Sequence, residues 1–155
     1  MNASVFWLAT AAYSLHILEE YLLDWRDWAR NALGLPVDWD IFYLVNAAAV
    51  VIGVCCAASA RELPAFALSL PALMLINATF FHVLPFVRMR GRFSPGLFTA
   101  VLLFYPIGLW AYWDASRHGV LDAVTLGISL LLGAGLMASP IILLKIRGLP
   151  YFQQS

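Results

Sequence analysis

Three ionisable side chains lie close together near the start of the chain, in a stretch that is otherwise apolar. His16, Glu19 and Glu20 are spaced i, i+3 and i+4, so on a helix they share one side within an arc of about 100°. Ionisable groups at membrane depth are costly, and they generally face the interior of a helix bundle, where they are paired or bound to something. We therefore predict that His16, Glu19 and Glu20 are catalytic residues.

These residue types are also typical of a metal site, because imidazole and carboxylate groups bind Zn²⁺ and other first-row metals. His82 adds a second imidazole from a later apolar segment. We predict His16, Glu20 and His82 as ligands of a divalent metal, either Zn or Fe/Mn. Glu19 is then a second ligand of a dinuclear site or a general base acting on bound water. If no metal binds, two neighbouring carboxyls repel each other, and one keeps a proton for acid/base catalysis with His16 as its partner.

Further polar side chains fall in the same half of other apolar segments. Asn46 and His82 lie at a similar depth, and Asn77 lies deeper. We predict that Asn46, Asn77 and Tyr105 bind substrate. Asn77 and His82 are five residues apart, which places them about 140° apart on an ideal helix. A kink or bulge near Pro85 would let them share a face, because proline cannot donate a hydrogen bond to the carbonyl one turn earlier.

The composition indicates a membrane protein. Of the 155 residues, 63% are hydrophobic and 12% are charged, and the formal net charge is +0. Soluble domains are about half apolar and about one quarter charged. The balanced charge argues against nucleic acid as a partner, since no basic stripe is available to bind phosphates. The two adjacent cysteines, Cys55 and Cys56, cannot form a disulfide framework.

The positions of the apolar stretches predict an all-α membrane protein, a bundle of five transmembrane helices that forms a single integral membrane domain over residues 1–155. Each stretch is long enough to cross the hydrocarbon core of a bilayer. The nine basic residues fall mainly in the first and third connections and after the fifth stretch, which places the N-terminus outside and the C-terminus in the cytoplasm. The expected spans are residues 3–23, 40–60, 63–87, 95–113 and 121–146.

Three local patterns refine this organisation. Residues 25–33 alternate Trp and Ala with charged residues at helical spacing, which predicts a short interfacial helix between the first two spans. Ser94, Pro95 and Gly96 predict the start of the fourth span, with the serine as its cap. In the fifth span, small residues four apart are typical of close helix packing; the pairs are Ser129/Gly133 and Gly135/Ser139.

On these motifs the chain resembles the HXXEE family of small bacterial integral membrane proteins, whose function is uncharacterised. The matching motif is His16, Glu19 and Glu20 in a first span. Asn77 and His82 in a later helix, and Pro95 with Gly96 before another, complete the resemblance. It implies an active site at these residues, a bacterial origin and a multi-pass protein of the plasma (inner) membrane, but it implies no substrate.

Three classes of function fit these features. The first is an intramembrane enzyme that acts on a lipid or isoprenoid-like substrate from the cytoplasmic leaflet. The second is a carrier of protons or divalent metal ions, although no inverted repeat is visible and the outer half offers no polar path. The third is a non-catalytic membrane subunit that binds lipid or metal. The expected partners are the lipid bilayer and a hydrophobic small molecule, and a homodimer remains an open alternative.

Overall fold

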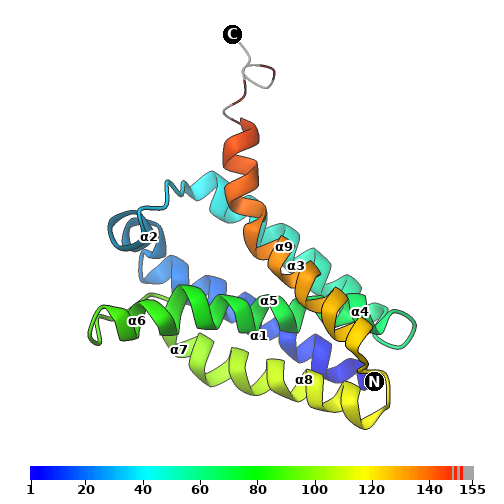
Figure 1. The fold of residues 1–155 in the computed structure, drawn as a ribbon. Coiled ribbons are helices and arrows are strands. Elements are labelled where there is room, and N and C mark those ends of the chain that lie inside the picture. The colour runs from blue at the N-terminus through cyan, green and yellow to red at the C-terminus, as the bar shows by residue number, and fades with distance from the viewer. Residues whose placement is uncertain (148, 150, 152–155) are drawn as a thin grey trace.

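The computed structural model describes residues 1–147, 149 and 151, and every regular element in them is helical. Two helices with a short connection, α1 (Ala3–Leu22) and α2 (Trp25–Leu33), precede α3 (Trp39–Ala58). Figure 1 shows α1 lying beneath α3 and beside α5, with α9 crossing the upper side of the bundle. The remaining elements are α4 (Pro64–Ala67), α5 (Ser69–Asn77), η1 (Ala78–Val83), α6 (Leu84–Arg88), α7 (Leu97–Thr99), η2 (Ala100–Phe104), α8 (Tyr105–Arg117) and α9 (Ala123–Arg147).

Within the described residues, four continuous helical stretches are long and apolar enough to cross a membrane. They are Trp39–Ala58, Pro64–Arg88, Leu97–Arg117 and Ala123–Arg147. The second runs from α4 through α6, and the third from α7 through α8. The all-α fold is therefore confirmed, and four of the expected spans lie close to their predicted bounds. Helix α1 has 20 residues but is less apolar, because it carries His16 and the two glutamates. The first expected span, residues 3–23, the total of five spans and the orientation stay predictions.

Helix α1 supplies the centre of the packed core. Val5, Phe6 and Ala9 on α1 are fully buried, together with Phe104 in η2 and Met74 on α5. These large and small side chains fill one continuous cluster between α1, α3, α5 and α8. One side of α1 is exposed and apolar, through residues such as Trp7, Leu15 and Leu18, whereas His16 and Glu20 lie on the buried side and face protein. Such enclosure is how a membrane bundle tolerates ionisable side chains.

Two π-helical segments interrupt the longer helices next to the candidate site. Segment η1 ends at Val83, two residues before Pro85, and η2 ends at Phe104, two residues before Pro106. Proline removes one backbone donor, and a π segment, with its i→i+5 hydrogen bonds, is a common way for a helix to accommodate this. The predicted bulge near His82 is therefore confirmed as a π segment that begins directly after Asn77.

A helix also forms where the sequence predicted a short interfacial one, as α2, and its place at a membrane interface stays a prediction. Its apolar side is buried through Trp25 and Ala29, whereas its charged side chains pair along the outside. Arg30 donates to the Val37 carbonyl and pairs with Asp38, which ties α2 to the segment before α3. The Arg26 guanidinium beside Asp27 holds the pKa of that carboxyl below its usual value.

The two predicted small-residue pairs of α9 differ in their surroundings. A Cβ added to Gly133 would lie 2.6 Å from the Ala72 Cβ and 2.7 Å from the Leu73 backbone nitrogen, so α9 and α5 touch at this glycine. Ser129 on the same side is fully buried. A Cβ on Gly135 would meet nothing within 4 Å. The Ser129/Gly133 pair therefore lies at a helix contact, and Gly135 does not.

This difference predicts opposite outcomes for the same substitution two residues apart. Gly133→Ala should lower the unfolding free energy by about 1–3 kcal/mol, because backbone and Ala72 must move to admit the methyl group. Gly135→Ala should be neutral or slightly stabilising, since alanine favours helix by up to roughly 1 kcal/mol over glycine. Equilibrium unfolding of the two variants in one detergent tests this. Equal effects of both substitutions would contradict the close α5–α9 contact.

Candidate metal centre

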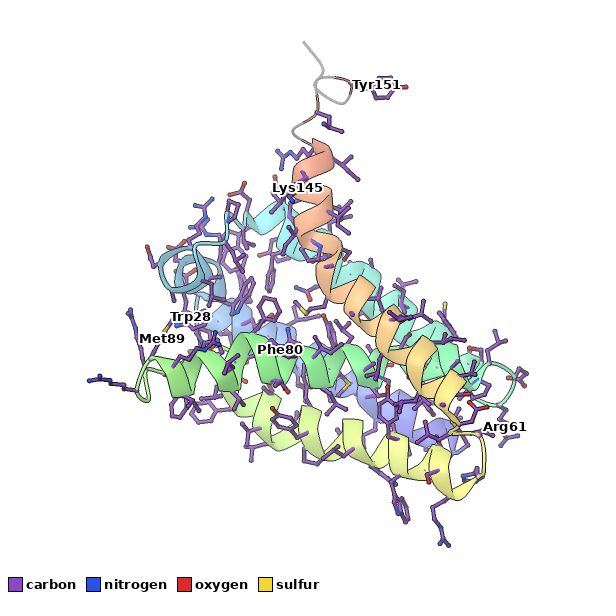
Figure 2. All side chains as sticks on the ribbon, viewed as in Figure 1. Trp28, Arg61, Phe80, Met89, Lys145 and Tyr151 are labelled. Carbon is purple, nitrogen blue, oxygen red and sulfur yellow. The ribbon has the colours of Figure 1, made fainter. Side chains whose placement is uncertain are left out.

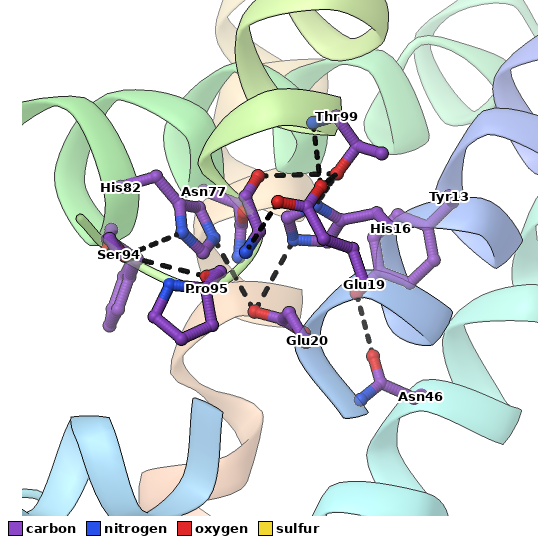
Figure 3. A network of polar contacts seen from close by, with 12 residues as sticks. Tyr13, His16, Glu19, Glu20, Asn46, Asn77, His82, Ser94, Pro95 and Thr99 are labelled. Atoms are coloured by element: carbon purple, nitrogen blue, oxygen red, sulfur yellow. Dashed lines mark hydrogen bonds and ion pairs between the residues drawn. The ribbon is translucent and has the colours of Figure 1, made fainter. Parts of the chain in front are cut away.

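Three buried side chains from two helical elements converge on one point. His16 and Glu20 lie one turn apart on α1, and His82 comes from η1. The Nε2 atoms of both histidines lie 3.4 Å from the same Glu20 oxygen, Oε1. One ligand atom from each residue lies within 4.8 Å of the others, and the three residues are 1%, 4% and 0% exposed. Figure 3 shows both rings directed at Glu20.

The hydrogen bonds of His16 determine which of its ring nitrogens carries the proton. His16 Nδ1 lies 2.7 Å from the Thr99 hydroxyl oxygen. That hydroxyl has one hydrogen, and it donates it to Glu19 Oε2 at 2.6 Å. A carboxylate can only accept, so the Thr99 oxygen must accept from the Nδ1–H of His16. Assigned from this network, His16 presents a bare lone pair at Nε2.

His82 also has a hydroxyl beside its Nδ1 atom. Its Nδ1 lies 3.0 Å from Ser94 Oγ. Ser94 Oγ also lies 3.3 Å from the Phe81 carbonyl and 3.5 Å from the Pro95 carbonyl, to either of which it can donate its hydrogen. When Ser94 donates to one of these carbonyls, it accepts from the Nδ1–H of His82, and the lone pair of His82 then lies at Nε2. Ser94 thus connects the segment before α7 to both Phe81 and His82 of η1.

The Nε2 atoms of His16 and His82 thus face the same carboxylate oxygen, each at 3.4 Å. Neither Nε2 has a hydrogen-bond partner, although both are buried. A divalent cation would satisfy all three atoms, and two histidines with a glutamate form a known zinc ligand set. Ligands about 2.0–2.1 Å from a tetrahedral zinc are about 3.3 Å apart. The two N–O distances of 3.4 Å match that spacing, so the group could hold a metal ion.

Glu19 lies beside this group with a different set of partners. Its two oxygens accept four hydrogen bonds, three of them from backbone N–H groups. The donors are Gly96 N at 3.1 Å, Phe98 N at 3.1 Å, Thr99 N at 2.8 Å and the Thr99 hydroxyl. Glu19 therefore fastens the start of α7 to α1. Through the same Thr99 hydroxyl it also fixes His16.

The segment that Glu19 holds lies directly against the candidate metal ligands. Gly96 has a φ of +93°, a backbone conformation that residues other than glycine rarely adopt. A Cβ there would lie 2.6 Å from His82 Cε1, 2.7 Å from His16 Cε1 and 3.1 Å from Glu20 Cγ. Glycine is required at this position for its conformation and for its size. The predicted capping role of Ser94 is wrong: Gly96 is the N-cap of α7, and the Ser94 side chain binds His82 because α7 begins later.

The predicted substrate-binding residues divide between two places. Asn46 and Asn77 line a cavity of about 90 Å³ beside Glu20, together with Tyr13, whose hydroxyl donates to Asn46 Oδ1 at 3.2 Å. Tyr105 instead shares a hydrogen bond of 2.9 Å with Thr79 and does not line this cavity. We refer to the space beside Glu20 as the inner cavity. Its predicted members come from three different helices, α1, α3 and α5.

Two important contacts, those of Ser94 and Thr99 with the histidines, were not anticipated. A hydroxyl residue near an apolar helix start is common, and spacing alone does not show which distant ring it meets. The nearest signal in the sequence is that Ser94 and Thr99 flank the Pro95–Gly96 pair.

Comparison with known proteins identifies the family. The model of the HXXEE family, described as proteins of unknown function with an HXXEE motif, matches residues 7–111. The chain therefore belongs to this family, and the match includes every residue of the candidate metal centre. The comparison with curated proteins gave no match, and neither did the comparison with solved structures.

Gly96 and Gly91 form a matched pair for testing how closely the loop approaches the site. Both have positive φ, but a Cβ on Gly91 would meet only Phe86, at 3.8 Å. Each change to alanine should cost the backbone strain of about 1–3 kcal/mol. Gly96→Ala should cost clearly more, because the methyl group displaces both imidazole rings. Thermal unfolding of the two variants measures the difference, and an equal loss in both would argue against the close approach.

Proposed function

We propose that this protein is an integral membrane enzyme that acts on a lipid or isoprenoid-like substrate through a divalent metal held by His16, Glu20 and His82. One observation carries the proposal: two buried imidazole nitrogens, neither with a hydrogen-bond partner, lie 3.4 Å from the same carboxylate oxygen. A merely structural polar cluster would satisfy its members with hydrogen bonds. An arrangement that leaves both Nε2 atoms without a donor favours a bound cation.

The ligand set suits zinc, iron or manganese, since imidazole and carboxylate serve all three. Such a metal polarises a substrate oxygen or lowers the pKa of a bound water. The chain's own residues would hold the metal and orient its ligands. Thr99 and Ser94 orient the two histidine rings, and Asn46 lines the inner cavity with Glu20. The four donors on Glu19 favour a positioning role for it over that of a general base.

For its setting, we propose a bacterial inner membrane with the site in the cytoplasmic half of the bundle. The clustering of Arg and Lys at one end of the helices supports this orientation. Helix α1 would also cross the membrane, as the first of five spans. Its exposed side is apolar and its buried polar residues face the core, so its lower hydropathy is compatible with crossing.

Metal binding can be tested with the chain's three histidines. Purified protein loaded with Zn²⁺, Fe²⁺ or Mn²⁺ should retain about one ion per chain. His16→Ala and His82→Ala should each abolish retention, because three ligands become two. His118→Ala is the matched control, since His118 is half-exposed and contacts Asp114, away from the site. Metal analysis after gel filtration reads the result.

A second pair of variants separates ligand loss from misfolding. Thr99→Val removes the hydroxyl that orients His16 and should weaken metal affinity by about 10–100-fold, and Thr99→Ser should retain most of it. Wild-type protein that keeps no metal under any loading condition would overturn the metal centre.

Catalysis can be tested with the chain's three glutamates. The metal-loaded protein, reconstituted in vesicles of a bacterial total lipid extract, should change the amount of at least one lipid. Glu20→Gln should abolish the change, because it removes the carboxylate shared by both histidines. Glu62→Gln, at an exposed position, should leave the change intact. Mass spectrometry of the extracted lipids provides the readout.

Two outcomes would contradict the enzyme. Identical lipid profiles with wild-type and Glu20→Gln protein would remove the evidence for turnover. Flux of protons or metal ions across the vesicles, abolished by Glu20→Gln and accompanied by no lipid change, would identify a carrier.

A further inference from the structure

A second cavity lies between the inner cavity and the outside of the bundle. It measures about 340 Å³, within the range of about 300–1,000 Å³ typical of small-molecule pockets. Its walls are the segment between α2 and α3, η1 and the C-terminal part of α9. We call it the apolar groove; its lining includes Leu35, Pro36, Phe81, Ile141 and Leu144.

The apolar groove and the inner cavity adjoin each other. Trp25, Val37, Met137 and Pro140 line both of them. Of the three candidate metal ligands, Glu20 is the one that lines the inner cavity. A molecule that fills both spaces would thus pass from the groove, between these four side chains, to the carboxylate of the candidate metal centre.

A bend of α9 at Pro140 accounts for the open space of the apolar groove. It lies inside α9 and cannot donate a hydrogen bond to the carbonyl one turn earlier, which bends a helix. Figure 1 shows α9 changing direction in its C-terminal part. Ile141, directly after the proline, lines the groove and is 42% exposed, so the groove reaches the surface of the bundle. Lys145 lines its outer end, and Figure 2 shows it near the C-terminal end of α9.

The two ends of this path differ in chemistry. Apart from Lys145, the groove is lined by apolar residues and prolines, along with Trp25. The inner cavity adds amides and a phenol, from Asn46, Asn77 and Tyr13. The Tyr13 hydroxyl donates a hydrogen bond to Asn46 Oδ1, which leaves the Asn46 NH₂ group as a donor for a ligand. Asn77 Oδ1 is buried and has no hydrogen-bond partner. One small group that both accepts and donates would satisfy the two amides, as a hydroxyl does.

We propose that the groove and inner cavity bind a single-chain lipid alcohol, with its apolar chain in the groove and its hydroxyl between Asn46 and Asn77. The volumes of the two spaces, about 340 Å³ and about 90 Å³, suit one long chain with a small polar end. This inference rests on the proposed function, because it names the substrate class for the same site. The lipid alcohol enters from the side of α9 that carries Ile141 and Lys145, and its hydroxyl group ends beside Glu20.

Photolabelling in a bilayer tests the binding site. The full-length protein in dimyristoylphosphatidylcholine nanodiscs is mixed with a hexadecanol that carries a diazirine at mid-chain, and the labelled residues are mapped after illumination. Labels should concentrate on residues 35–37 and 137–145. Excess unlabelled hexadecanol should compete, and added dipalmitoylphosphatidylcholine should not.

Two leucines of α9 provide matched variants. Leu144 lines the groove, and Leu143, similarly half-buried, lines neither cavity. Leu144→Trp should reduce labelling several-fold by filling the groove, and Leu143→Trp should not. Labels spread along the lipid-exposed face of α9, unchanged by Leu144→Trp, would overturn the proposal.

The outcome is independent of the metal experiment. Loss of metal binding with intact, groove-specific labelling would refute the metal-dependent enzyme and leave the lipid site standing. Normal metal retention with unspecific labelling would refute the lipid site alone.

Discussion

The organising constraint of this molecule is the need to satisfy two adjacent carboxylates inside an apolar bundle. Charged groups in such surroundings persist only when they are paired or bound. Glu19 meets this need with three backbone N–H groups and a hydroxyl, all from one short segment. Glu20 points instead at two imidazole nitrogens that have no hydrogen-bond partner. One residue therefore anchors the fold, and its neighbour is left available for a cation.

The anchor and the open site are mechanically coupled. Thr99 accepts from His16 and donates to Glu19, so the clamp that holds α7 also orients a candidate ligand. The same Glu19 hydrogen bonds hold Gly96 in close contact with both imidazole rings. Second-layer contacts of this kind fix ring orientation and tautomer at metal sites. A change that loosens the start of α7 would therefore be transmitted to the site without touching it directly.

The π segments make this arrangement possible on α-helical elements. An ideal helix would turn Asn77 and His82 to different sides, and the i→i+5 bonding of η1 changes that register. Ser94 contacts this segment at two points, the Phe81 carbonyl and the His82 ring. The π segment η1 and the Ser94 hydroxyl thus together orient the His82 imidazole.

The sequence alone was sufficient for the all-α class, the short helix after α1, the bulge at His82 and the choice of His16, Glu20 and His82 as a group. These follow from local rules: apolar length, helical periodicity, proline chemistry and the cost of burying charge. The different situations of Glu19 and Glu20, the roles of Ser94 and Thr99 and the separation of Tyr105 from the inner cavity were decided by the tertiary structure. They depend on which side chains from distant segments meet, and no local pattern specifies that. Adjacent residues on one helix can point into different neighbourhoods, and only the packing of α1 against α7 and η1 assigned each glutamate its partners.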